Sequence, residues 1–137
     1  MSMTTKITSA DPVAKIMVEG LSEVDPGQSL RSVAQQLVAD EIGVVFVQIP
    51  GGPVGLISER DLVNALVDGA DFNAQQAIDV ATTDLVTAQP GDSIASVGHM
   101  MLEAWVRHIA VYEGDTVVGL VSIRDVLAVL LASAQTG

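Results

Sequence analysis

The sequence contains no cysteine and few basic or aromatic residues. The lack of cysteine among 137 residues excludes disulfide scaffolds, thiol catalysis and cysteine-ligated zinc. Only six lysines and arginines stand against 17 acids, and the net charge of −11 argues against nucleic acid and anionic membranes as partners. No apolar run approaches the roughly 20 residues of a membrane span, and residues 1–11 lack the apolar stretch of a signal peptide. With 49% hydrophobic and 17% charged residues, the composition predicts a globular, cytoplasmic protein.

Two motifs occur twice in the chain at one spacing. Pro-Gly-Gln-Ser at 26–29 returns as Pro-Gly-Asp-Ser at 90–93, and Gly-Leu-Ile-Ser-Glu-Arg-Asp at 55–61 returns as Gly-Leu-Val-Ser-Ile-Arg-Asp at 119–125. Both pairs are 64 residues apart, which points to a tandem duplication. The sequence therefore predicts three parts, an N-terminal tail at 1–11, a first repeat at 12–70 and a second repeat at 76–133.

Each repeat opens with a predicted short helical turn and continues into an amphipathic helix. In the first repeat, Asp11 is the expected cap of the turn, and Pro12 suits its first helical position. An extended piece follows and stops at each Pro-Gly. The apolar stripe of the next helix comprises Leu30, Val33, Ala34, Leu37 and Val38 in the first repeat and Ile94, Val97, Gly98, Met101, Leu102 and Trp105 in the second.

A strand pair and a closing helix complete each repeat. The strand pairs are expected at 44–57 and 109–121, and the closing helices begin at Ser58 and Ser122. The turn at 50–53, Pro-Gly-Gly-Pro, predicts irregular pairing in the first hairpin. A unit of about 60 residues is marginal by itself. We therefore expect an α/β fold of two β-α-β-β-α repeats packed as one module with pseudo-two-fold symmetry.

The closing helix of the second repeat is apolar on every side. Residues 126–132 read Val-Leu-Ala-Val-Leu-Leu-Ala. One face of this helix must be covered by something outside its own repeat. Self-association into a homodimer is the expected solution, and the alternative is a helix packed between the two repeats.

The repeated motif resembles that of CBS domains, the family named after cystathionine β-synthase. Gly-h-h-Ser-x-x-Asp, in which h is an apolar residue, closes both repeats, and Val-Arg-His-Ile-Ala-Val at 106–111 is similar to the family's strand entry. The resemblance covers about residues 12–132 and implies a tandem CBS pair. Such a pair is a non-enzymatic regulatory module that binds AMP, ADP, ATP or a related adenosyl ligand in clefts between its repeats and modulates a partner protein. No other cofactor is implied.

The resemblance also implies ligand-binding positions. The motif aspartate contacts the ribose, the serine approaches phosphate, the apolar residue after the glycine packs on the base, and the strand entry and opening segments line the cleft. Carried to this sequence, these positions are Asp61, Asp125, Ser58, Ser122, Leu56, Leu120, Ile42, Val106, Arg107, His108, Met17, Val18, Ala81 and Thr82.

The residue chemistry agrees with these roles. A carboxylate can accept two hydrogen bonds from a vicinal diol, and a serine at a helix start lies among unpaired N–H groups that favour an anion. Arg60 and Arg124, beside the motif aspartates, add guanidinium groups suited to phosphate. Arg107 and His108 have Gly43 and Val44 as counterparts, so we expect the two clefts to differ in phosphate donors.

Other interpretations of these residues remain open. Ser-x-x-Asp is also a helix-capping pattern, and the arginines could simply pair with Glu59, Asp61 or Asp125. No set of residues in the sequence has the pattern of a catalytic or metal site. The alternatives to a nucleotide sensor are a ligand-free dimerisation module and a module that binds S-adenosylmethionine.

Overall fold

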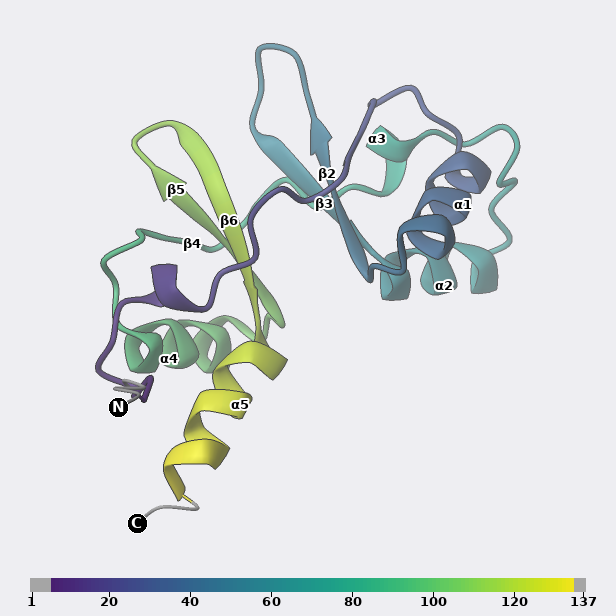
Figure 1. Ribbon diagram of the computed structural model, residues 1–137. Helices are drawn as coiled ribbons and strands as arrows, with labels where there is room; N and C mark the ends of the chain where they lie inside the picture. The colour runs from purple at the N-terminus through teal and green to yellow at the C-terminus, as the bar shows by residue number, and fades with distance from the viewer. Residues whose placement is uncertain (1–5, 135–137) are drawn as a thin grey trace. The chain divides into compact units, whose positions relative to one another are not determined.

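The order of elements confirms the predicted α/β class and the β-α-β-β-α repeat. The computed structural model describes residues 6–134 (Figure 1). In chain order the elements are η1 (Val13–Lys15), β1 (Glu23–Val24), α1 (Leu30–Asp40), β2 (Val44–Gln48), β3 (Val54–Ser58), α2 (Glu59–Val67), α3 (Ala77–Val80), β4 (Thr87–Ala88), α4 (Ile94–Ala104), β5 (His108–Glu113), β6 (Thr116–Ser122) and α5 (Ile123–Ala134).

The chain forms two compact units with the same topology. The central unit comprises residues 21–85, and the N/C unit comprises residues 1–20 and 86–137. Each contains a three-stranded sheet, β1-β2-β3 or β4-β5-β6, in which the first pair of strands is parallel and the second antiparallel. Two helices pack together beside each sheet, α1 with α2 and α4 with α5 (Figure 1).

The opening segments of the two repeats are exchanged between these units. Each core contains ten buried residues, and nine of the ten in one core have their counterparts 64 positions along in the other. The remaining pair is exchanged: Val13, from the first repeat, is buried with the second repeat's sheet, and Ala77, from the second repeat, is buried with the first repeat's sheet. Backbone hydrogen bonds hold both segments, from Val13 N to Asp92 O (2.7 Å) and from Ala77 N to Gln28 O (2.7 Å). A compact unit is therefore built from parts of both repeats.

Met17 of the exchanged N-terminal segment lies directly over Gly119 of β6. A Cβ atom on Gly119 would come within 2.7 Å of the Met17 Sδ and 3.1 Å of its Cβ. We expect Gly119→Ala to lower the free energy of unfolding by roughly 1–3 kcal/mol, since the segment has to shift away. The same substitution should cost much less in a Met17→Ala background.

The wild type, Gly119→Ala, Met17→Ala and the double variant form a double-mutant cycle. Urea unfolding of these four proteins measures the coupling between Met17 and Gly119. Gly91→Ala is the control, because a Cβ there meets no atom within 4 Å. Equal costs of Gly119→Ala in both backgrounds would show that Met17 does not pack on this strand.

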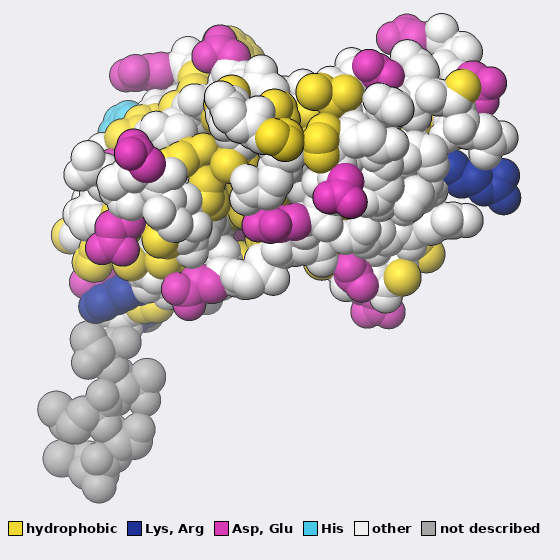
Figure 2. Space-filling model, turned by 90° about the horizontal axis from the view of Figure 1, so that it is seen from above, with side chains coloured by type: hydrophobic (Ala, Val, Ile, Leu, Met, Phe, Trp, Pro, Cys, Tyr) yellow, Lys and Arg dark blue, Asp and Glu magenta, His cyan; other side chains and the backbone are white. Residues whose placement is uncertain are grey.

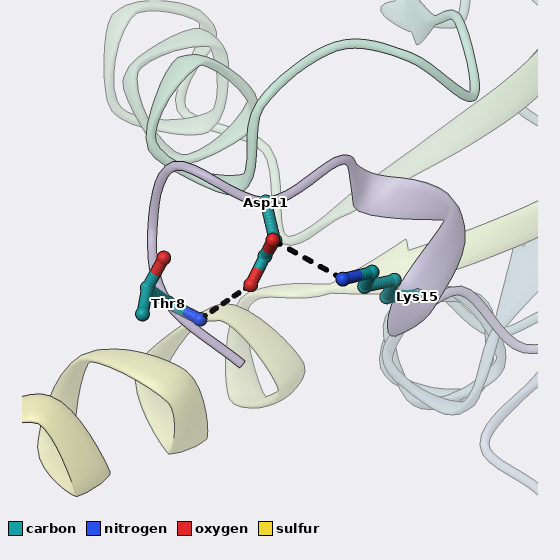
Figure 3. Close-up of polar contacts among 3 residues, drawn as sticks. All are labelled: Thr8, Asp11 and Lys15. Carbon is teal, nitrogen blue, oxygen red and sulfur yellow. Dashed lines mark hydrogen bonds and ion pairs between the residues drawn. The ribbon is translucent and has the colours of Figure 1, made fainter. Parts of the chain in front are cut away.

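Asp11 does not cap the first helical turn, so that prediction was wrong. The N-cap of η1 is Pro12, with extended backbone angles (φ −67°, ψ 144°), and it makes no side-chain capping bond. The Asp11 carboxylate instead accepts hydrogen bonds from Thr8 N (2.8 Å) and Lys15 Nζ (3.2 Å), as Figure 3 shows. The Thr8 N–H bond, followed by the Lys15 contact, lowers the pKa of Asp11. A carboxyl whose pKa is lowered by folding stabilises the fold above its unfolded-state pKa, and this contribution is lost as the pH falls through the folded value.

The irregular hairpin is the second one and not the first. Pairing of β2 with β3 runs without a break from Val44↔Ser58 to Gln48↔Val54, because Gly51 (φ +71°) turns the chain outside the ladder. In the second hairpin, Val111 pairs with Gly119 and Tyr112 with Val117. The intervening residue of β6 forms a bulge, which fits a hairpin with one extra residue on one strand.

The apolar stripes of the long helices are only partly core. The residues buried from α1 are Leu30, Val33 and Leu37, and those from α4 are Ile94, Val97 and Met101. Trp105 was expected in this stripe, but it ends α4 in the left-handed conformation (φ 56°) and is 93% exposed. Val38 and Leu102 are exposed as well. The three buried residues of each helix already fill the helix face that meets the sheet.

Helix α5 has both a core face and an exposed apolar face. Val126 and Val129 are buried, whereas Leu127, Leu130 and Leu131 are exposed. The predicted apolar surface on this helix is therefore present. In the part of the chain that the structure describes, no helix combines the length and apolar character needed to cross a membrane.

Candidate functional site

The sixteen predicted ligand residues separate into two sets, each within one compact unit. The central unit contains Ile42, Leu56, Ser58, Arg60, Asp61, Ala81 and Thr82, and the N/C unit contains Met17, Val18, Val106, Arg107, His108, Leu120, Ser122, Arg124 and Asp125. In both units the set surrounds the point where the last strand of the sheet passes into a helix, β3 into α2 and β6 into α5. We call these two places the central corner and the N/C corner.

Serine and aspartate form the same hydrogen-bonded cap at both corners. Oδ2 of Asp61 accepts bonds from Ser58 N (2.7 Å) and Ser58 Oγ (3.0 Å), while Asp61 N donates to Ser58 Oγ (3.2 Å). The N/C corner repeats this arrangement, with Oδ2 of Asp125 accepting from Ser122 N (3.0 Å) and Ser122 Oγ (2.9 Å). The capping interpretation of Ser-x-x-Asp is therefore confirmed as geometry.

Capping leaves half of each aspartate available. All of the bonds just given use Oδ2, and Oδ1 accepts no hydrogen bond from residues 6–134 in either corner. A carboxylate oxygen that the fold does not use can accept a ligand hydroxyl. The cap also fixes the carboxylate, so that this oxygen is held in place before a ligand arrives.

The exchanged opening segments run beside the third strand of each sheet. Val18 and Leu120 bond reciprocally through their backbones (2.8 and 3.0 Å), and so do Leu56 and Thr82 (both 2.9 Å). These bonds occupy the N–H groups of Val18 and Thr82, and their carbonyl oxygens keep one lone pair each. Both motif leucines are buried. At each corner, the opening segment of the other repeat therefore contributes backbone groups next to the last strand of the sheet.

The arginines at the corners are exposed and have no ionic partner among residues 6–134. Lys15–Asp11 is the ion pair found in this part of the chain. Arg60, Arg107 and Arg124 are not paired with Glu59, Asp61 or Asp125, so the ion-pair interpretation of these arginines was wrong. Acidic side chains are spread over the face seen in Figure 2, and basic side chains are few there. The guanidinium groups are free to contact an external anion.

One feature of the corners was not predicted from the sequence. Glu59 N donates to Gly43 O (2.9 Å), and at the N/C corner Ile123 N donates to Arg107 O (2.8 Å). A Cβ on Gly43 would lie 3.0 Å from Oε1 of Glu59. The central corner thus holds a carboxylate against the backbone position from which the N/C corner projects an arginine. The spacing of 64 residues between the repeats pairs Gly43 with Arg107 and Glu59 with Ile123. This pairing is the signal in the sequence from which the difference in charge could be predicted.

Comparison with known proteins identifies the family. The CBS domain model matches residues 13–68 and 77–132. The chain belongs to the CBS domain family. The two matches correspond to the two sequence repeats, so this CBS pair carries one family motif at each corner.

Similar proteins include both sequence relatives and solved structures. The CBS pair is 26% identical over 121 residues to the uncharacterized protein MJ1225 of Methanocaldococcus jannaschii, covering 88% of this chain but only 43% of that protein. It is 30% identical to the CBS-domain containing protein ATU1752 of Agrobacterium tumefaciens, with a TM-score of 0.77 over 85% of this chain and 97% of the other. The CBS domain protein PAE2072 of Pyrobaculum aerophilum, whose crystal structure is a complex with AMP, is 24% identical, with a TM-score of 0.76 over 90% and 98% of the two chains.

Proposed function

We propose that this CBS pair is a non-enzymatic sensor that binds an adenine nucleotide, AMP, ADP or ATP, and thereby modulates a partner protein. The observation that carries the proposal is the duplicated corner: the capped aspartate has one oxygen that accepts no hydrogen bond from residues 6–134, and the arginine before it in the chain has no ion-pair partner among these residues. The AMP complex of the similar protein PAE2072 supports the same ligand class. We place the sensor in the cytoplasm, where adenine nucleotides are abundant.

Each group at a corner has a separate task in this proposal. Oδ1 of Asp61 or Asp125 accepts the ribose hydroxyls, and the exposed arginines contact phosphate through charge-assisted hydrogen bonds. The opening segment presents backbone carbonyls to the amino group of the base. Ser58 and Ser122 support the aspartates directly, because their hydroxyl groups already donate to Oδ2.

A thermal-shift screen tests this function against the alternatives. We expect AMP, ADP or ATP to raise the melting temperature, because a ligand that binds only the folded state stabilises it. A shift with S-adenosylmethionine alone would favour the alternative adenosyl ligand. No shift with any of them would favour a ligand-free dimerisation module.

We also propose that the CBS pair is a homodimer. Apolar side chains between 42% and 79% exposed occupy equivalent positions on the helices of both repeats. This repeated helical stripe comprises Val38 and Leu102, Val63 and Leu127, Leu66 and Leu130, and Val67 and Leu131. A second copy carries the same stripe, so it can cover this surface with apolar residues.

Light scattering at micromolar concentration tests the dimer. We expect twice the mass of the chain, and we expect Leu131→Glu to yield the single-chain mass with an unchanged circular dichroism spectrum. Leu131 is suited to this test because it is exposed and its loss opens no cavity in the core. A wild-type protein of single-chain mass would contradict the dimer.

A further inference from the structure

The two corners differ in charge at positions that the backbone makes equivalent. The bonds from Glu59 N to Gly43 O and from Ile123 N to Arg107 O show that each pair of residues occupies the same place in its unit. The N/C corner therefore combines Arg107 and Arg124 with Ile123, which is neutral. The central corner has Arg60 alone, and the Glu59 carboxylate stands next to it in the chain.

Glu59 gives the central corner a negative charge at the position where the N/C corner has Ile123. Its Oε1 lies 3.0 Å from the position that a Cβ on Gly43 would take, so the carboxylate stands beside the place where the other corner's arginine side chain begins. Like charges at short range disfavour each other. A phosphate that gains from Arg107 in one corner is thus opposed by Glu59 in the other.

We propose that the two corners select different ligands of one class. The N/C corner takes the phosphorylated adenosine, and the central corner takes an adenosyl ligand without a phosphate, with Glu59 as the residue that excludes the phosphate. This proposal rests on the proposed nucleotide function, since it assigns the phosphate in that function to one corner. Asp61 and Asp125 remain equivalent ribose acceptors, so adenosine itself is admitted by both.

Calorimetric titration of the full chain separates the two corners. We expect one AMP per chain, and we expect protein saturated with AMP to take up one further adenosine per chain. Asp125→Asn should weaken the AMP event at least about tenfold, and Asp61→Asn should weaken the adenosine event by a similar factor. Glu59→Gln should add a second AMP event, with an affinity for AMP at the central corner at least about tenfold above that of the wild type. The reciprocal change, Ile123→Glu, should weaken the first AMP event by a similar factor.

The control variant carries the same charge change at the other end of the same helix. Asp68→Asn lies at the C-cap of α2, whereas Glu59 is the first residue of α2. We expect it to leave one AMP per chain. Two equal AMP events in the wild type, or one event that Glu59→Gln leaves unchanged, would overturn the assignment of the corners while leaving nucleotide binding intact. The absence of any AMP event in every variant would instead overturn the proposed function.

Discussion

Asp125→Asn should weaken AMP binding at least about tenfold while the fold remains as stable as the wild type to within about 0.5 kcal/mol. A hydrogen bond to a charged group contributes about 1.5–3 kcal/mol, and losing one such bond to the ribose accounts for a factor of this size. The asparagine keeps an oxygen that can accept from Ser122 N, so the helix cap is retained. Its amide nitrogen then replaces the oxygen that would receive the hydroxyl.

Asp125→Ala gives the contrast that separates binding from capping. This variant loses the acceptor for Ser122 N and Oγ, so we expect it to lower the free energy of unfolding by about 1 kcal/mol in addition to weakening AMP. Calorimetry with AMP and urea unfolding measure the two effects separately. If both variants melted early and the folded fraction bound AMP with wild-type affinity, the aspartate would be a helix cap only.

Replacement of Arg107 and Arg124 by alanine should abolish the preference for AMP over adenosine. We expect the wild-type N/C corner to bind AMP at least about tenfold more tightly than adenosine, which corresponds to one charge-assisted bond to phosphate. The net charge of −11 opposes the arrival of an anion. This repulsion is screened beyond roughly 8 Å at physiological ionic strength, so the direct contact dominates.

The control for the arginine variants is adenosine itself. Both arginines are exposed and have no ion-pair partner among the described residues, so their removal should change neither the fold nor the affinity for adenosine. Calorimetric titrations of Arg107→Ala, Arg124→Ala and the double variant against both ligands measure the preference. Equal affinities for AMP and adenosine in the wild type would show that the arginines do not contact phosphate.

The duplication explains why so much of the fold could be predicted from the sequence. Two motifs at one spacing locate the strand–helix corners, and Gly-h-h-Ser-x-x-Asp carries the cap with it, since a serine and an acid three residues apart satisfy the first N–H groups of a helix. The elements between these motifs follow from their apolar periodicity. The resemblance to CBS domains then implies which residues of each repeat lie at the two corners.

The exchange of the opening segments could not be predicted in this way. Val13 and Ala77 are both small apolar residues at equivalent positions, so their local sequence does not reveal which sheet each segment joins. The choice depends on contacts distant in sequence, such as those of Met17 with Gly119. The exposure of apolar residues near a helix end depends in addition on where the helix stops. Trp105 continues the helical pattern, but the helix ends at that residue and its side chain points away from the core.

Calorimetric titration of the wild-type chain with AMP, adenosine and S-adenosylmethionine tests most directly whether these corners form a nucleotide sensor. We expect AMP to bind most tightly, with an affinity at least about tenfold above that of S-adenosylmethionine, because only AMP offers a phosphate to Arg107 and Arg124. The absence of binding by all three ligands, or tighter binding of S-adenosylmethionine than of AMP, would contradict this function.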